Sequence, residues 1–308
     1  MSTNSDPAGS TFDDGPALIR PRRTRADAVR VWLRFMRGNK MMMIGAALML
    51  VIVIVAVFAP LIAPYSYNEM MTSERPFERP SASHLFGTDN FGRDVFSRVV
   101  FGSRISLGVA LVSVFFGTLL GVPLGMLAGY IGGWFDSLVM RFSDAVMSIP
   151  TILMAVAVTA MIGSGLRVVI LTLALVFIPG GARLARGMVY SVKEREYVAA
   201  AKVIGERRTQ TLLRYIFPNI VAPIIVQATL RLSAAVLAEA TISYLGYGTQ
   251  APTPSWGLML ADSQVYMWQA PLLAVFPGLA LVLLVLAGNL LGDGLRDLLD
   301  PKFRGSLQ

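Results

Sequence analysis

The chain has 308 residues, of which 55% are hydrophobic and 15% are charged, and its mean hydropathy is +0.61. This composition excludes an ordinary soluble domain and indicates an integral membrane protein. The formal net charge of +8 could suggest a nucleic-acid partner, but the basic residues gather in the N-terminal tail and in one central loop, so orientation in a membrane explains them better and we expect no nucleic-acid partner.

The residue types that usually carry catalysis or bind metals are scarce. The absence of cysteine excludes disulfides and a Cys-based metal or redox site. His84 is the only histidine, and we interpret it as a loop residue rather than a ligand or a base. No lysine follows a glycine, so the chain has no Walker A phosphate loop. We therefore predict no catalytic residue, no metal and no cofactor.

Residues 1–40 are predicted to form a cytoplasmic tail. Its first 25 residues are rich in Ser, Asp, Pro and Arg without apolar periodicity, which is typical of disorder. The segment that follows has an apolar and an arginine-rich helical face and is predicted to be an interfacial helix. The uncharged run 41–63 begins too late for a signal peptide and is long enough for a hydrocarbon core of ~30 Å, so we expect a first transmembrane helix there.

Residues 64–104 balance five basic against five acidic residues and are predicted to be an extracytoplasmic loop. Asp89, Arg93, Asp94 and Arg98 form a carboxylate–guanidinium cluster in this loop. The cluster either ties the loop to a partner subunit or is a solvated local network. The sequence leaves these two interpretations open.

Residues 105–292 are predicted to hold five further spans, near 105–130, 145–163, 166–185, 221–245 and 271–291. In the second span, Gly117, Gly121, Gly125 and Gly129 lie four residues apart, which favours close helix packing over a substrate path. Pro123 is expected to kink this span.

The fifth span carries two intramembrane charges, Arg231 and Glu239. An ionisable residue inside a membrane normally faces protein or water, so Gln227, Arg231 and Glu239 are candidates for a translocation path. One alternative is a helix that continues below the membrane and places Arg231 near the headgroups. Another is an Arg–Glu pair that closes a contact between subunits. In the loop that follows, Trp256 suits a membrane interface or a protein contact.

The basic residues predict the orientation. With both termini inside and residues 293–308 as a cytoplasmic C-terminal tail, twenty of the 27 Lys and Arg residues lie in the cytoplasm, six lie outside and Arg231 lies within a span. The basic segment from Arg93 to Arg104 is the exception to this asymmetry.

The central loop, residues 183–218, has the character of a docking helix. Ala199, Ala200 and Ala201 give strong helix propensity with little bulk, and Gly205 allows a turn. Tyr197, Ala201 and Ile204 form an apolar stripe at helical spacing. The alternative is an amphipathic helix that lies on anionic lipid.

Four separated motifs resemble one family. The segment from Tyr197 to Gly205, with Pro218 thirteen residues later, resembles the EAA loop of ABC-importer permeases, although the family's glutamate falls on Ala199. Residues 84–107, 243–257 and 289–301 resemble the C-type permease subunit of bacterial dipeptide, oligopeptide and nickel importers.

This resemblance implies an all-α fold of six transmembrane helices, the type I ABC importer permease fold, in the bacterial inner membrane. It implies that the 196–218 loop couples to separate ATPases and that the outer motifs could contact a binding protein or partner. The coupling residues would be Tyr197, Ala199, Ala200, Ala201, Gly205 and Pro218, and the contact residues Asp89, Arg93, Asp94, Arg98 and Trp256. The expected partners are a homologous B-type permease, two ATPases, an extracytoplasmic substrate-binding protein and the lipid bilayer.

The family favours di- or oligopeptides as the solute. The alternative function is a secondary transporter or channel that works without ATPases, with Arg231 and Glu239 as its gating or coupling charges. An intramembrane hydrolase is a further alternative, but it would have to rely on His84.

Overall fold

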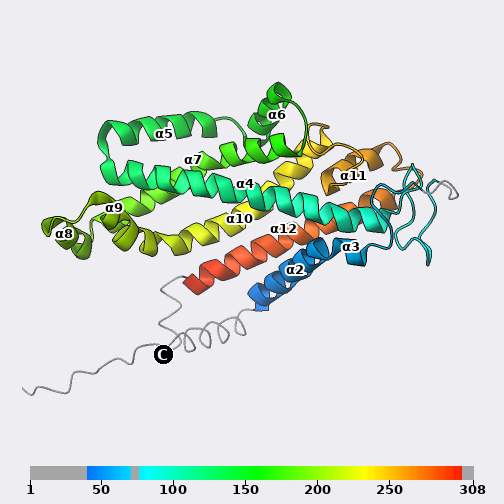
Figure 1. Ribbon diagram of the computed structural model, residues 1–308, viewed down its shortest axis with the longest axis horizontal. Coiled ribbons are helices and arrows are strands. Elements are labelled where there is room, and N and C mark those ends of the chain that lie inside the picture. The colour runs from blue at the N-terminus through cyan, green and yellow to red at the C-terminus, as the bar shows by residue number, and fades with distance from the viewer. Residues whose placement is uncertain (1–39, 71–75, 300–308) are drawn as a thin grey trace, which may run out of the picture. The chain divides into compact units, whose positions relative to one another are not determined.

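The computed structural model describes residues 40–70 and 76–299, and within these ranges it contains helices and no β-strand. The helices are α2 (Lys40–Val57), α3 (Ala59–Ile62), α4 (Val95–Ile131), α5 (Gly133–Met147), α6 (Thr151–Ile162), α7 (Leu166–Lys193), α8 (Glu196–Val203), α9 (Arg208–Thr211), the π-helical turn η1 (Leu212–Ile216), α10 (Phe217–Tyr244), α11 (Trp256–Gln264) and α12 (Leu272–Leu299) (Figure 1). The predicted interfacial helix before Met41 lies outside the described residues.

Five helical segments of the described ranges are long and apolar enough to cross a membrane. They are α2, α4, α7, the continuous segment Arg208–Tyr244 and α12. The pair α5 and α6 passes the same test only as one bent unit, with an angle of 88° between the two helices. The described chain therefore has five spans, or six if this bent pair counts as one.

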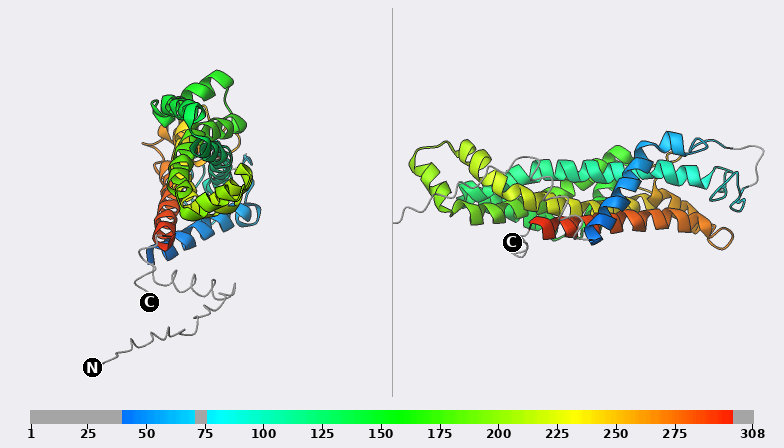
Figure 2. Two further views of the ribbon diagram at one scale, coloured as in Figure 1. Left: turned by 90° about the vertical axis from the view of Figure 1, so that its left-hand side faces the viewer. Right: turned by 90° about the horizontal axis from the view of Figure 1, so that it is seen from below.

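The bundle is built around α4 and α7, which lie side by side over most of their length (Figure 1). Helix α10 packs on α4, α7 and α12, while α2 packs on α12 and touches α4. Figure 2 shows α2 and α12 next to each other at one edge of the bundle. The main apolar core lies where α4, α7, α10 and α12 meet.

The glycine ridge of α4 lies directly against α7. An added Cβ at Gly125 would fall 2.0 Å from the Ala182 carbonyl oxygen, and one at Gly121 would fall 2.5 Å from the Ile178 carbonyl oxygen. Gly117 and Gly129 face the same helix. The small residues let the two backbones approach closely, so the packing interpretation of the ridge is confirmed.

Helix α4 begins ten residues before the predicted span. Asp94 is its N-cap, because its carboxylate accepts a 2.7 Å hydrogen bond from the Ser97 amide and satisfies a donor of the first turn. Residues 95–104, which the sequence placed in the outer loop, are therefore helical. Helix α7 likewise continues past Arg183 and Arg186 to Lys193.

The third predicted span differs most from the structure. The sequence indicates a short loop and then one span over 145–163, whereas the structure has the helix α5, a break at Ser148–Pro150 and the shorter helix α6. Proline disfavours helical backbone at Ile149, the residue before it, which explains the position of the break.

Candidate functional site

Helix α8 lies at one end of the bundle, between the ends of α7 and α9, and we call this end the α8 end (Figure 1). Val198 and Ala201 are 0% and 2% exposed, respectively. Val198 joins an apolar cluster with Val192, Leu212 and Ile216, which lie on α7 and on the turn that leads into α10. This buried side fixes α8 against α7 and the π-helical turn η1.

The other side of α8 is open. Tyr197 is 39% exposed, Val203 is 86% exposed and Ile204, just after the helix, is 77% exposed. Ala199 and Ala200 are exposed beside them. The predicted stripe of Tyr197, Ala201 and Ile204 therefore needs correction, because Ala201 belongs to the buried side of the helix. The exposed side of α8 is therefore a small apolar surface. The glutamate that the family has there is replaced by Ala199.

Gly205 ends α8 in a tight turn. Its φ is +79°, a conformation that residues with a Cβ rarely adopt. The Gly205 amide donates to the Lys202 carbonyl and the Glu206 amide donates to the Ala201 carbonyl, each at 3.1 Å, which is the Schellman pattern. The predicted turn is confirmed. Pro218 lies in the first turn of α10, directly after the π-helical turn η1.

A polar cluster next to α8 was not predicted. Asp136 of α5 is 5% exposed and accepts hydrogen bonds of 2.6 Å from Arg186 and 2.8 Å from the Tyr190 hydroxyl, both on α7. The Lys193 ammonium lies 3.8 Å from the centroid of the Tyr190 ring and donates to the Gly129 carbonyl at 3.2 Å. The i, i+4 spacing of Arg186 and Tyr190 was the available signal that both face one partner.

Arg231 lies in the middle of α10 and is half-buried. Its guanidinium donates a 3.2 Å hydrogen bond to the Phe177 carbonyl of α7. A Cβ on Gly180 would fall 2.5 Å from the guanidinium, so Pro179-Gly180-Gly181 leaves room for this charge against the α7 backbone. Gln227 lies one turn earlier on α10 and is also half-buried.

Glu239 lies elsewhere, in a closed polar cluster. It is 0% exposed, and one of its carboxylate oxygens accepts a 2.7 Å hydrogen bond from the Ser243 hydroxyl. No ion pair joins Glu239 to Arg231 in the part of the chain that the structure describes. Glu239 faces the interior of its own chain, which contradicts both its predicted place on a translocation path and the alternative of an intersubunit pair.

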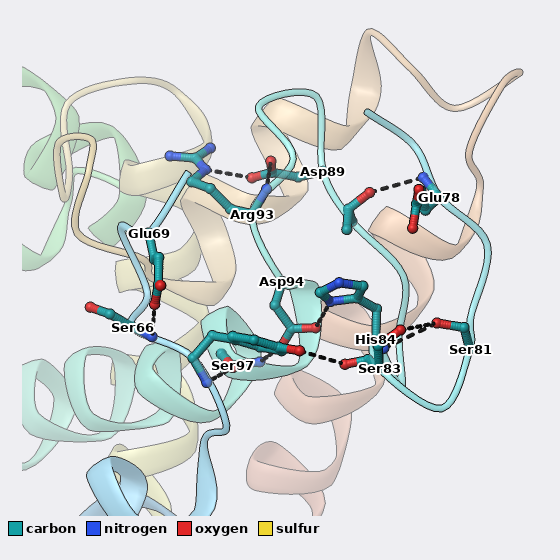
Figure 3. Close-up of polar contacts among 12 residues, drawn as sticks. Ser66, Glu69, Glu78, Ser81, Ser83, His84, Asp89, Arg93, Asp94 and Ser97 are labelled. Atoms are coloured by element: carbon teal, nitrogen blue, oxygen red, sulfur yellow. Dashed lines mark hydrogen bonds and ion pairs between the residues drawn. The ribbon is translucent and has the colours of Figure 1, made fainter. Parts of the chain in front are cut away.

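The opposite end of the bundle carries the second charged group (Figure 3). His84, 0% exposed, stacks on Tyr65 and its Nδ1 lies 2.9 Å from Asp94 Oδ1. Asp89 accepts a 2.7 Å hydrogen bond from Arg93 Nε, and Arg98 Nε lies 3.6 Å from the same oxygen. These side chains tie the loop to the start of α4.

Arg98 also joins this network to distant segments. It donates to the Tyr67 carbonyl at 3.0 Å and to the Pro252 carbonyl at 3.4 Å. Burial raises the pKa of the nearby Asp262 carboxyl, and the Arg98 and Arg93 guanidiniums oppose that rise. The cluster is thus a buried internal network rather than a solvated one, and its contact with a partner subunit stays a prediction.

Trp256 is a core residue. It is 2% exposed, its indole N–H donates to the Val99 carbonyl at 3.0 Å, and its ring lies over Gly102 of α4. The expectation of a direct contact with another protein is therefore corrected, because the side chain joins α11 to α4.

The helical bundle and its exposed α8 define a multi-pass membrane protein with a projecting helix at one end. Residues 121–305 match the family model described as binding-protein-dependent transport system inner membrane component, and residues 28–80 match the N-terminal TM domain of oligopeptide transport permease C. The chain belongs to this family of binding-protein-dependent inner-membrane transport components and is a permease subunit of an ABC importer.

Curated relatives agree with this assignment. The dipeptide transport system permease protein DppC of Alkalihalophilus pseudofirmus is 42% identical over 287 residues, which cover 92% of this chain and 94% of the relative. The glutathione transport system permease protein GsiD of Escherichia coli is 44% identical over 288 residues, which cover 94% of this chain and 95% of the relative. The predicted family is confirmed.

A solved structure supports the fold. A chain of the inward-facing MetNI methionine ABC transporter matches with a TM-score of 0.51 and 20% identity, covering 66% of this chain and 97% of that chain. The predicted helical membrane fold is confirmed. Members of the family are not themselves enzymes, and they work in the inner membrane with ATPases and binding proteins.

Proposed function

We propose that this chain is the C-type half of a heteromeric importer for small peptides. Its partners are a homologous B-type permease, two ATPases and an extracytoplasmic substrate-binding protein. Two relatives that match almost the whole chain are named for dipeptide and glutathione transport, and both solutes are short peptides. The α8 end and both termini face the cytoplasm in this proposal, because the basic residues concentrate there.

The exposed side of α8 is the observation that carries the proposal. Tyr197, Val203 and Ile204 give an apolar surface on a helix that is fixed from behind by Val198. An apolar helix face that projects from a membrane bundle costs free energy in water and gains it in a groove of a partner. Ala199 and Ala200 let a partner's surface come close to the α8 backbone. Motion of the ATPase then reaches α7 and α10, which hold α8.

Co-purification from native membranes tests the docking. We expect wild type to carry the ATPases and the second permease. Ile204→Asp places a charge on the docking surface, and Gly205→Pro is incompatible with φ of +79°, so both are expected to lose the ATPases while they keep the second permease. Trp268→Asp is the matched control, because Trp268 is 99% exposed at the opposite end and its replacement leaves the ATPases bound.

If wild type emerges without ATPases and still moves peptide in liposomes, the secondary-transporter alternative replaces this proposal. If Ile204→Asp and Trp268→Asp retain the same amount of ATPase, the exposed side of α8 is not the docking surface.

We further propose that Gln227 and Arg231 line the translocation path and that Arg231 attracts the carboxylate of a passing peptide. Loss of a hydrogen bond to a charged group costs ~1.5–3 kcal/mol, so Arg231→Ala is expected to lower the uptake of a free dipeptide about tenfold or more. Uptake of the C-terminally amidated dipeptide should change little.

Glu239→Gln serves as the control for this experiment. It keeps the shape of the side chain, and Glu239 is closed off inside the fold, so transport should be retained. If Arg231→Ala and wild type take up the free dipeptide equally, in complexes of equal yield, Arg231 does not line the translocation path.

A further inference from the structure

A groove runs between α2 and α4 on the surface of the bundle. Its volume is about 340 Å³, near the lower end of the range for small-ligand sites. Its lining is apolar apart from one arginine and consists of Val53, Ala56, Val57, Arg104, Leu107, Gly108 and Leu111. Both flanking helices are candidate membrane spans, so this groove opens toward the bilayer rather than toward water.

Arg104 sits at the edge of the apolar part of α4. It is exposed, and the 27 residues that follow it, from Ile105 to Ile131, carry no charge. A charge at that boundary lies at the level of the lipid headgroups. Within the described residues, no carboxylate lies in ion-pair distance of Arg104, whereas the nearby Arg93 and Arg98 share Asp89.

The groove continues directly below this charge. Arg104, Gly108 and Leu111 have the i, i+4, i+7 spacing that places them on one face of α4. A Cβ added to Gly108 would meet no atom within 4 Å, so the missing side chain keeps the groove open. The Arg104 guanidinium therefore lies at the end of an apolar groove between two membrane helices.

We propose that this groove is a specific site for an anionic phospholipid, with the phosphate on the Arg104 guanidinium and an acyl chain between α2 and α4. Guanidinium and phosphate form strong charge-assisted hydrogen bonds, and the groove matches an acyl chain in polarity. An apolar helix of a partner subunit would fill the groove but would leave the arginine without an anion. The inference uses only the membrane placement of α2 and α4 and is independent of the proposed solute.

Native mass spectrometry of the intact complex tests the site. Complexes are released from nanodiscs made of phosphatidylglycerol and phosphatidylethanolamine, and the lipids retained by each complex are counted. We expect wild type to retain phosphatidylglycerol in preference to phosphatidylethanolamine. Arg104→Gln should reduce that preference about fivefold, the effect of one basic residue on anionic lipid. Gly108→Leu fills the groove and should reduce the retention of both lipids.

Arg167→Gln is the matched control for charge. Arg167 is an exposed arginine in the first turn of α7 and lines no part of the groove, so its replacement should leave lipid retention unchanged. If Arg104→Gln and Arg167→Gln reduce lipid retention equally, the effect comes from general surface charge. That result would overturn the proposed site. Retention in the isolated full-length chain but not in the complex would show that a partner subunit covers the groove, and would also overturn it.

Discussion

Replacing Gly125 with leucine is expected to prevent the stable packing of α4 on α7. Its Cβ alone would fall 2.0 Å from the Ala182 carbonyl oxygen and 2.6 Å from the carbonyl carbon, so the backbone of α7 would have to move. Overpacking a core typically costs ~1–3 kcal/mol through side-chain rearrangement, and a clash with backbone should exceed that range. The loss should appear as a low yield of monodisperse protein and a lower melting temperature in detergent.

Gly108→Leu is the control, since Gly108 lies on the same helix and has open space where the side chain would go. Both variants add the same side chain to α4, so a difference between them isolates the contact with α7. If Gly125→Leu and Gly108→Leu have the same melting temperature, the close approach of α4 and α7 is not what stabilises the bundle.

The second large effect, a loss of thermal stability, is expected when Asp89 is replaced with alanine. This carboxylate is the shared partner of Arg93 and Arg98, which are 3% and 2% exposed. Asp89→Ala leaves two buried guanidiniums without their anion, and breaking a buried pair in this way typically costs ~3–5 kcal/mol. We expect a strong fall in thermal stability and, because Arg98 also binds the Tyr67 and Pro252 carbonyls, increased protease cleavage in the loops at that end.

Two further variants serve as comparisons for Asp89→Ala: one removes only the charge of Asp89, and the other breaks an exposed ion pair. Asp89→Asn keeps an oxygen that can accept from the Phe91 and Arg93 amides, so it should lose less stability than Asp89→Ala. Asp144→Ala removes the partner of Arg183 in an exposed pair and should cost less than ~1 kcal/mol. If Asp89→Ala is as mild as Asp144→Ala, the network does not hold the loop.

Hydrophobicity and glycine spacing predicted the long helices well. The spans that became α2, α7, α10 and α12 are continuous apolar runs, and the four-residue glycine spacing of α4 identified the face that packs on α7. The helix ends were predicted less well, since apolar content marks the membrane core and helices extend beyond it. Asp94 as an N-cap moved the start of α4 outward.

The remaining errors arose where burial depends on contacts between distant segments. The segment between the second and third predicted spans forms helix α5, and its Asp136 is paired with Arg186, fifty residues away. Trp256 and Glu239 resembled an interface anchor and a pore charge by type alone. Their burial depends on Val99, Ser106 and Ser243, and no local pattern indicates that these residues meet them.

Helix α7 has Pro179 close to its midpoint, where Arg231 of α10 touches its backbone. About 20 Å of helix lies on each side of that proline, since each residue adds about 1.5 Å. One arm ends beside α8, and the other ends near α6 at the far side of the bundle. The Arg231 contact therefore divides α7 into two arms of equal length, each close to two-thirds of the ~30 Å thickness of a hydrocarbon core.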